Sequence, residues 1–453
     1  MDPLPLSRRA LLGLSALTGA VVLVGCSDEE APSSGKSSVG RKKPAPTATD
    51  VPRLRDQPPA AEGADARSPA DAWRYSHVPE RSGAGYRAMA VTSRDDVWLL
   101  GVTGMEAKNP GPAKAFLDHW DGSAWREREL PSDLRTAGVS AGTWAWGLAA
   151  SRADELWLVH VPGRDEGRPR VYRFDGKDWH TLPALPEVPE EAGGSDHGGM
   201  MCVAGGHVWL RVGRRVAHFD GEKWDVPKLP FEAHALTAAP DGDGEPRVWV
   251  VGMVEGTCEG EGECSPQPAS ARWADGAWQR MRTPEYHFPD PVPPEAWATL
   301  DTVTYDPVSQ QVWAFGANDF NHGEVDEEPA SRGIVLRGDG TRWHKAEVGD
   351  ATELRASGLA CPDGTGGFLI DTWERLDKDG HHRSVKAPAR LPEPHEIPMP
   401  PRKYDFDQPM DPAVAALIPG TRTVLAAGVV TFNNSSDDGN PPLRPVLARY
   451  DPR

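Results

Sequence analysis

The chain is poor in cysteine, in basic residues and in long apolar runs. Five of its 453 residues are cysteine, and none forms a close cluster with histidine, which excludes a zinc-ligand motif and a disulfide-dense scaffold. Lysine and arginine number 49 against 67 acidic residues, so the net charge is −18. Because phosphate binding needs a basic face, no nucleic-acid partner is predicted. The longest apolar run, 10–24, is shorter than the roughly 20 residues of a transmembrane helix.

Motifs that carry catalysis or bind metals are scarce too. The chain has no His-Glu-x-x-His and no nucleophile with an evident base, so no catalytic residue and no metal site is predicted. The stretch Asp-Gly-Asp-Gly-Glu at 241–245 is similar to the start of a calcium loop but lacks the later ligands, and a turn is expected there. No cofactor is predicted, with calcium as the alternative.

The N-terminus has the pattern of an export signal. Two arginines at 8–9 precede the apolar run, which ends in Leu-Val-Gly-Cys at 23–26. This ending resembles a bacterial lipobox, and Ser-Arg-Arg-Ala-Leu-Leu at 7–12 resembles a twin-arginine signal. The resemblance implies a lipoprotein signal peptide over 1–25 and a diacylglyceryl anchor on Cys26 that holds the protein at the outer face of the bacterial cytoplasmic membrane. The general secretory route and an ordinary cleaved secretory peptide are the alternatives.

The segment 26–71 contains the lipidated cysteine and a linker rich in proline, alanine, serine and glycine. It has almost no large apolar residue, so it cannot bury enough surface to offset the entropy of ordering. A disordered tether is predicted.

A repeated unit fills 72–453. The chain holds 17 tryptophans, 47 glycines and 45 prolines, and short apolar runs with a tryptophan recur along it. A second strand that ends in an aspartate turn, most often Asp-Gly, follows each run, and Asp-Gly is a strong hairpin signal. Units of four strands, about 55 residues apart, predict the blades of an all-β propeller. The runs contain Trp98, Trp157, Trp209, Trp249 and Trp313, with weaker copies at 368–370 and 423–428.

The two ends of this region predict how the ring closes. The last unit stops after its third strand, while 72–79 is an orphan fourth strand similar to 124–131. The N-terminal strand is therefore expected to complete the last of seven four-stranded antiparallel blades, which hides both sheet edges. The region resembles bacterial propeller lipoproteins and, more loosely, the WD-repeat-like superfamily, whose third strand ends in Trp-Asp.

The tryptophan and aspartate series are predicted to be structural. Tryptophans at this spacing pack between sheets, and turn carboxylates accept hydrogen bonds from amides of their own turn. A ring of carboxylates for calcium is the alternative reading of Asp121, Asp175, Asp220, Asp275, Asp339, Asp379 and Asp451. Trp144 and Trp146 alternate on a first strand, and first strands line a propeller channel, so one of the two is a candidate channel residue.

Four cysteines follow Cys26. Cys258 and Cys264 share one loop and are expected to form a disulfide in an oxidising exterior. Cys202 and Cys361 fall on first strands of the third and sixth blades and are expected to be buried thiols.

Long, acidic loops are predicted to gather on one face. They connect second to third strands and fourth to first strands, and those of blades three to five carry most of the negative charge. Such a face suits a basic protein or another cell-envelope partner. A binding or scaffold module is therefore predicted, with a hydrolase, lyase or quinone-dependent oxidoreductase as the alternative. The candidate binding face comprises Glu187, Glu190, Glu255, Glu259, Glu261, Glu263, Asp319, Asp326, Glu327 and Glu328.

Overall fold

The computed structural model of the chain describes most of the repeat region. The described residues are 72–105, 113–136, 145–161, 168–186, 201–239, 246–256, 265–288, 295–321, 331–348, 359–391, 410–432 and 443–452. The predicted signal peptide, Cys26 and the predicted tether lie outside them.

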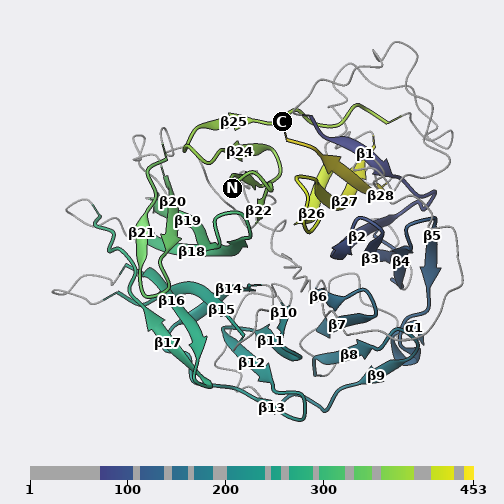
Figure 1. Ribbon diagram of the computed structural model, residues 1–453, viewed down its shortest axis with the longest axis horizontal. Helices are drawn as coiled ribbons and strands as arrows, with labels where there is room; N and C mark the ends of the chain where they lie inside the picture. The colour runs from purple at the N-terminus through teal and green to yellow at the C-terminus, as the bar shows by residue number, and fades with distance from the viewer. Residues whose placement is uncertain are drawn as a thin grey trace, which may run out of the picture.

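Seven four-stranded antiparallel sheets form a ring, so the predicted seven-bladed β-propeller is confirmed (Figure 1). The first strand of each blade lies nearest the centre and the fourth at the rim (Figure 1). In chain order the blades are β2 (Ala84–Ser93), β3 (Asp96–Thr103), β4 (Ala115–Trp120) and β5 (Trp125–Arg128); β6 (Ala145–Arg152), β7 (Glu155–Val161), β8 (Arg170–Phe174) and β9 (Trp179–Thr181); β10 (Met201–Ala204), β11 (His207–Val212), β12 (Arg215–Phe219) and β13 (Trp224–Asp225); β14 (Glu232–Ala238), β15 (Val248–Val254), β16 (Gln267–Ala274) and β17 (Ala277–Met281); β18 (Glu295–Asp306), β19 (Gln311–Asn321), β20 (Arg332–Gly338) and β21 (Trp343–Lys345); β22 (Ala360–Pro362), β23 (Phe368–Ile370), β24 (Glu374–Leu376) and β25 (His382–Ser384); and β26 (Met410–Leu417), β27 (Val424–Thr431), β28 (Leu443–Tyr450) and β1 (Arg74–His77).

The N-terminal strand closes the ring as predicted. β1 pairs antiparallel with β28, and Arg74 lies opposite Arg449. The rings of Trp73 and Tyr450 are 5.5 Å apart, and the backbone N–H of Trp73 donates to the carbonyl of Lys386 in blade six at 3.0 Å. Blade seven is therefore built from both ends of the described chain.

The tryptophans of the second strands pack between blades, which confirms their structural role. Trp98 of blade one meets Phe174 of blade two at 5.9 Å, and Trp249 of blade four lies over Tyr305 of blade five at 6.0 Å. A cationic or imidazole side chain stands opposite each tryptophan on the neighbouring third strand. These partners are His119, Arg173, His218, Arg272 and Arg337.

The turn aspartates mostly bind their own turns. The carboxylate of Asp121 accepts the amide N–H groups of Ser123 and Ala124, and the same pattern recurs at Asp175, Asp220 and Asp339. In blade six the prediction of Asp379 was wrong. The turn carboxylate there is Asp377, which accepts the N–H groups of Asp379 and His381 because the turn is longer. Asp275 instead accepts from Gln279, and Asp451 from Thr423 and Arg449.

The expectation that only one face carries long connections needs one correction. Between β14 and β15 the connection occupies 239–247, on the face where the other turns are tight. Long connections at 129–144 and 346–359 add to the elaborated face. Within the described part of the chain the one helix is the short α1 (Ser132–Thr136), and no helix there is long and apolar enough to cross a bilayer.

Candidate functional site

Four first strands bulge at the same level, next to the centre of the ring. In blades one, four, five and seven, a glycine follows three residues after the tryptophan or leucine of the second strand: Gly101, Gly252, Gly316 and Gly428. Opposite each glycine, the first strand contains one extra residue. A bulge of this kind re-aims a side chain and is common beside active sites.

Glycine permits these bulges by close approach. A Cβ atom at Gly252 would lie 1.9 Å from the carbonyl oxygen of Glu232, and one at Gly428 would lie 2.0 Å from that of Asp411. Any larger residue would push the first strand away. The corresponding residues of blades two, three and six are His160, Val212 and Thr372, and the described pairing of these blades has no bulge at this level.

The bulges place chemically distinct residues at equivalent positions. Blades four and five are neighbours and present His234 and Asp301, whereas the neighbouring blades seven and one present Ala413 and Arg87. The two pairs of blades occupy opposite arcs of the ring (Figure 1). The bulge positions of blades four and five therefore carry polar side chains, and the bulge position of blade one carries a cation on the other arc.

His234 lies between two carboxylates from two blades. Its Nδ1 is 3.3 Å from Oδ1 of Asp301 and 3.0 Å from Oγ1 of Thr299, both on β18. Its Nε2 is 3.7 Å from Oε1 of Glu232, which also lies 3.2 Å from Nε of Arg214. The side chains of His234, Asp301 and Glu232 are about one-fifth exposed (21%, 20% and 19%), so the cluster is sheltered but open to small groups.

The carboxylates favour the protonated imidazole. Burial alone would lower the pKa of His234, but Asp301 and Glu232 outweigh it, and the pKa is raised above the usual 6.5. The pKa of Glu232 is lowered by its interaction with His234, then by Arg214 and Arg211, against the effect of burial. Arg211 is buried, which lowers its pKa to about 10, and the charge of Glu232 opposes that shift. We call His234, Glu232, Asp301, Thr299 and Arg214 the axial cluster.

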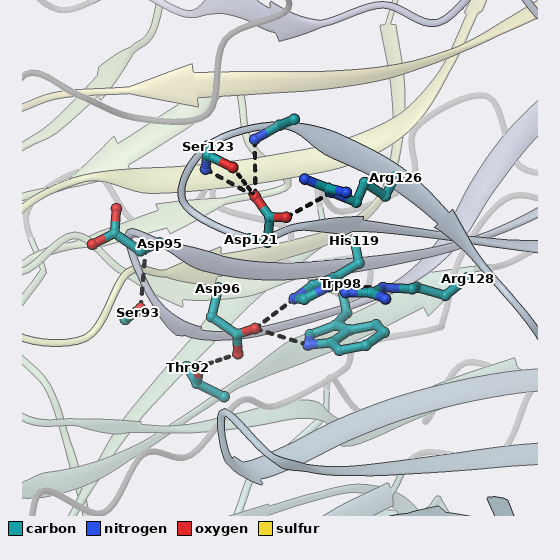
Figure 2. A network of polar contacts seen from close by, with 11 residues as sticks. Thr92, Ser93, Asp95, Asp96, Trp98, His119, Asp121, Ser123, Arg126 and Arg128 are labelled. Atoms are coloured by element: carbon teal, nitrogen blue, oxygen red, sulfur yellow. Dashed lines mark hydrogen bonds and ion pairs between the residues drawn. The ribbon is translucent and has the colours of Figure 1, made fainter. Parts of the chain in front are cut away.

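A second polar network, in blade one, is closed to ligands. Figure 2 shows Asp96 accepting hydrogen bonds from Thr92, from Nε1 of Trp98 at 3.1 Å and from Nε2 of His119 at 2.7 Å. His119 also stacks on Trp98, with ring centroids 3.6 Å apart, and its Nδ1 accepts from Arg128. A nucleophilic triad needs the hydroxyl bonded to the histidine. Here the hydroxyl of Thr92 donates to the carboxylate instead. The network therefore holds the strands of blade one together and has a structural role.

No family model matches the sequence, and a search of curated proteins found no match. Solved structures of similar fold include a protein of unknown function from Dyadobacter fermentans, 12% identical, which covers 84% of this chain and 99% of its own, with a TM-score of 0.38. A PL25 ulvan lyase is 10% identical over 82% of this chain and 95% of its own, with a TM-score of 0.41. The Bombyx mori GH32 β-fructofuranosidase is 13% identical over 83% and 80%, with a TM-score of 0.28. These likenesses concern the fold alone.

The candidate residues predicted from the sequence do not belong to the axial cluster. Trp146 is 1% exposed and packs between blades one and two, beside His160. Glu255 is exposed after β15, and Asp319 on β19 accepts a hydrogen bond from Ser331 at 2.5 Å. The residues outside the described part of the chain are Trp144, Glu187, Glu190, Cys258, Glu259, Glu261, Glu263, Cys264, Asp326, Glu327 and Glu328.

The two remaining cysteines are free and buried on β10 and β22, as predicted. Burial raises the pKa of both the Cys202 and the Cys361 thiols, so both stay protonated and unreactive.

One catalytic pattern in the sequence has the wrong context. Gly-Val-Ser-Ala-Gly at 138–142 matches Gly-x-Ser-x-Gly, but it lies between α1 and β6, outside the described residues. A nucleophile elbow needs a strand before the serine and a helix after it, whereas this segment has the reverse order.

Sequence reasoning missed the whole axial cluster. The glycine three residues after the tryptophan was the available signal, because an isolated glycine in a strand indicates a bulge or a close backbone approach. That signal marks the bulging blades, but it does not tell which side chains meet there.

Proposed function

We propose that the protein is an enzyme of the hydrolase or lyase class in which His234 transfers the proton. One observation carries this: an imidazole on a bulged inner strand is shared by carboxylates of two blades, with its pKa raised above 6.5. Among the solved structures of similar fold are glycoside hydrolases and a polysaccharide lyase, so polysaccharides are the first substrates to test.

The geometry supports general acid–base catalysis. Asp301 and Thr299 hold Nδ1 of His234 and orient the ring, whereas the 3.7 Å to Glu232 is longer than a hydrogen bond. The Nε2 proton is therefore available to a bound molecule. Hydrolases protonate a leaving oxygen and lyases move a proton from carbon, and an imidazole, which can both donate and accept a proton, serves either reaction.

The test compares two histidines that each contact a carboxylate. His234→Gln is expected to lower turnover of a polysaccharide substrate about 10²- to 10⁴-fold, because it removes the proton-transfer group. The control is His344→Gln on the fourth strand of blade five, where Nε2 lies 2.8 Å from Oδ2 of Asp339 on the exposed rim. Reducing-sugar release and absorbance of unsaturated products measure the two reaction types. Full turnover by the His234 variant, or no turnover of any polymer by the wild type, would contradict the assignment.

The pH profile provides a second test. If His234 acts as the acid, activity falls as the pH rises through its folded pKa, which lies above 6.5. Asp301→Asn removes one of the two charges that raise this pKa, so the alkaline limb is expected to move to lower pH. An alkaline limb that stays at the wild-type pH would show that another group controls the profile.

A binding or scaffold module is the second candidate. The charge of the long loops favours it, because loops of blades three to five carry most of the net charge of −18. Glu255 and Asp319 are the members of this face in the described part of the chain. A basic cell-envelope protein or divalent cations such as calcium would be its ligands.

The export signal leads to a proposal about location. We propose that the chain is a lipoprotein anchored through Cys26 outside the bacterial cytoplasmic membrane. Cys26→Ser removes the acceptor thiol, and the protein is expected to move from the membrane fraction to the soluble fraction, since two acyl chains supply the anchor. Unchanged fractionation of this variant would refute the lipid anchor.

A further inference from the structure

The strand that closes the ring buries a histidine without a hydrogen-bond partner. His77 is the last residue of β1 and is 4% exposed, and neither of its ring nitrogens has a partner in the described part of the chain. Most buried polar groups in proteins are hydrogen-bonded, because a buried group without a partner destabilises the fold. A phenylalanine ring would fill the same place without this cost, so the imidazole needs an explanation.

A bulge turns His77 towards blade one. Ser76 is an extra residue in the pairing of β1 with β28, and its hydroxyl donates to the carbonyl of Leu447 at 3.2 Å. A bulge of this kind re-aims the side chain beside it, here that of His77, which lies opposite the apolar Leu447. The equivalent fourth-strand residue of blade one is Arg128, which lies opposite Leu117 and is exposed. Blade seven therefore buries a titratable ring at a position that blade one leaves in solvent.

The ring of His77 packs on aromatic side chains of blade one. It stacks on Trp125 of β5, with ring centroids 4.1 Å apart and an angle of 14° between the planes. It also lies 6.3 Å from the ring of Tyr86 on β2. His77 thus joins the N-terminal strand to the next blade, so the charge of this one ring affects how the strand is held.

The charged groups around His77 already pair with one another. Arg81, which follows β1, lies 3.2 Å from Oδ1 of Asp118 on β4 and 2.9 Å from Oε2 of Glu127 on β5. The hydroxyl of Tyr86 donates to Oδ2 of Asp118 at 2.8 Å. A protonated His77 would therefore be close to the cation Arg81, while the carboxylates there are already paired. A buried imidazolium in this place is strongly disfavoured.

We propose that this arrangement makes the closure of the ring sensitive to acid: protonation of His77 releases β1 from β28 and opens blade seven. β1 is the element that leaves, because it is four residues long and pairs with one neighbour at the edge of its sheet. Release returns the imidazolium to water, and the other three strands of the blade keep their own pairing.

The pH range follows from the two states of the histidine. In the closed ring burial, and to a smaller extent the charge of Arg81, lowers the pKa of His77 from 6.5 to about 3. In the released strand the ring returns to the ordinary value of 6.5. Between these values the released state binds a proton that the closed state does not, so each pH unit below 6.5 favours release about tenfold. At pH 4.5 the shift is expected to be about 100-fold.

Hydrogen exchange of the full chain at pH 7.5 and pH 4.5 measures this release. The exchange rates of the β1 amides are divided by their intrinsic chemical rates at each pH, and β17, the fourth strand of blade four, is the reference. The protection of β1 is expected to fall about 100-fold in acid, whereas that of β17 stays nearly constant. Unchanged protection of β1, or an equal fall in both strands, would overturn the proposal.

Two variants show whether His77 is the group that titrates. His77→Phe keeps a ring on Trp125 but cannot take up a proton, so it is expected to abolish most of the acid effect on β1. Burial raises the pKa of Asp118, which can also lose its charge in acid, but this group is the same in the variant. The control is His180→Gln on the fourth strand of blade two, where an exposed histidine lies 2.7 Å from Asp175, and it is expected to respond as the wild type does.

The variants also define the results that contradict the proposal. A full fall in the protection of β1 in the His77 variant, or its disappearance in the His180 variant, would show that another group causes the release. If His77→Phe does not fold, as judged from its thermal melt at pH 7.5, His77→Leu replaces it. The comparison of β1 with β17 in the wild type tests the proposal without any substitution.

Discussion

A chain that lacks residues 72–78 is expected to melt at a much lower temperature than the intact protein and to aggregate. Trp73 is 2% exposed, its Nε1 donates to the carbonyl of Thr372 at 2.7 Å, and its ring packs on Tyr450. Truncating a buried tryptophan alone costs about 3–5 kcal/mol. The deletion also exposes the edge of β28, which then offers unpaired backbone groups to other chains.

A matched deletion separates closure from chain length. Removing the seven residues 57–63, within the predicted tether, is expected to leave the melting temperature unchanged. Trp73→Phe keeps an aromatic ring in the blade and is expected to cost less than Trp73→Ala. Calorimetry and light scattering measure both effects. Equal melting temperatures for the two deletions would show that the ring does not depend on β1.

Replacing Arg375 by leucine is expected to destabilise the protein by about 3–5 kcal/mol, because it leaves a buried charge without its partner. Nε of Arg375 lies 2.7 Å from Oδ2 of Asp363, and the two side chains are 8% and 0% exposed. Asp363 also accepts the amide N–H groups of Thr365 at 2.7 Å and Gly367 at 3.1 Å, so it organises the turn between β22 and β23. Denaturant titration measures the loss.

Two other variants show whether the charge is the cause. Asp363→Asn combined with Arg375→Leu removes both charges and is expected to recover much of the stability, since the amide still serves the turn. Arg126→Leu breaks an exposed pair with Asp121, 59% and 24% exposed, and is expected to cost at most about 1 kcal/mol. An Arg375 variant as stable as the Arg126 variant would contradict the argument.

The predictions that the structure confirms rest on local sequence patterns. Apolar runs around Trp98 and Trp249, each followed by a tight turn, indicate strands in any context, and counting them leads to seven blades. Which aspartate binds the amides of a turn was harder to predict. The turn between the third and fourth strands of blade six contains two aspartates, at 377 and 379, and the pairing of Leu376 with His382 makes Asp377 the one that caps the turn.

The axial cluster depends on contacts that no local pattern encodes. Sequence periodicity alone indicates how many blades form, where the tryptophans pack and how the N-terminal strand returns to the last blade. Tertiary structure alone decides that His234 on β14 meets Asp301, 67 residues later, and Thr299, 65 residues later. The physical reason is that strand and turn preferences act within a few residues, whereas these pairs arise from how closely separate blades approach. Glycines such as Gly252 allow that approach, and the packed ring determines which side chains it brings together.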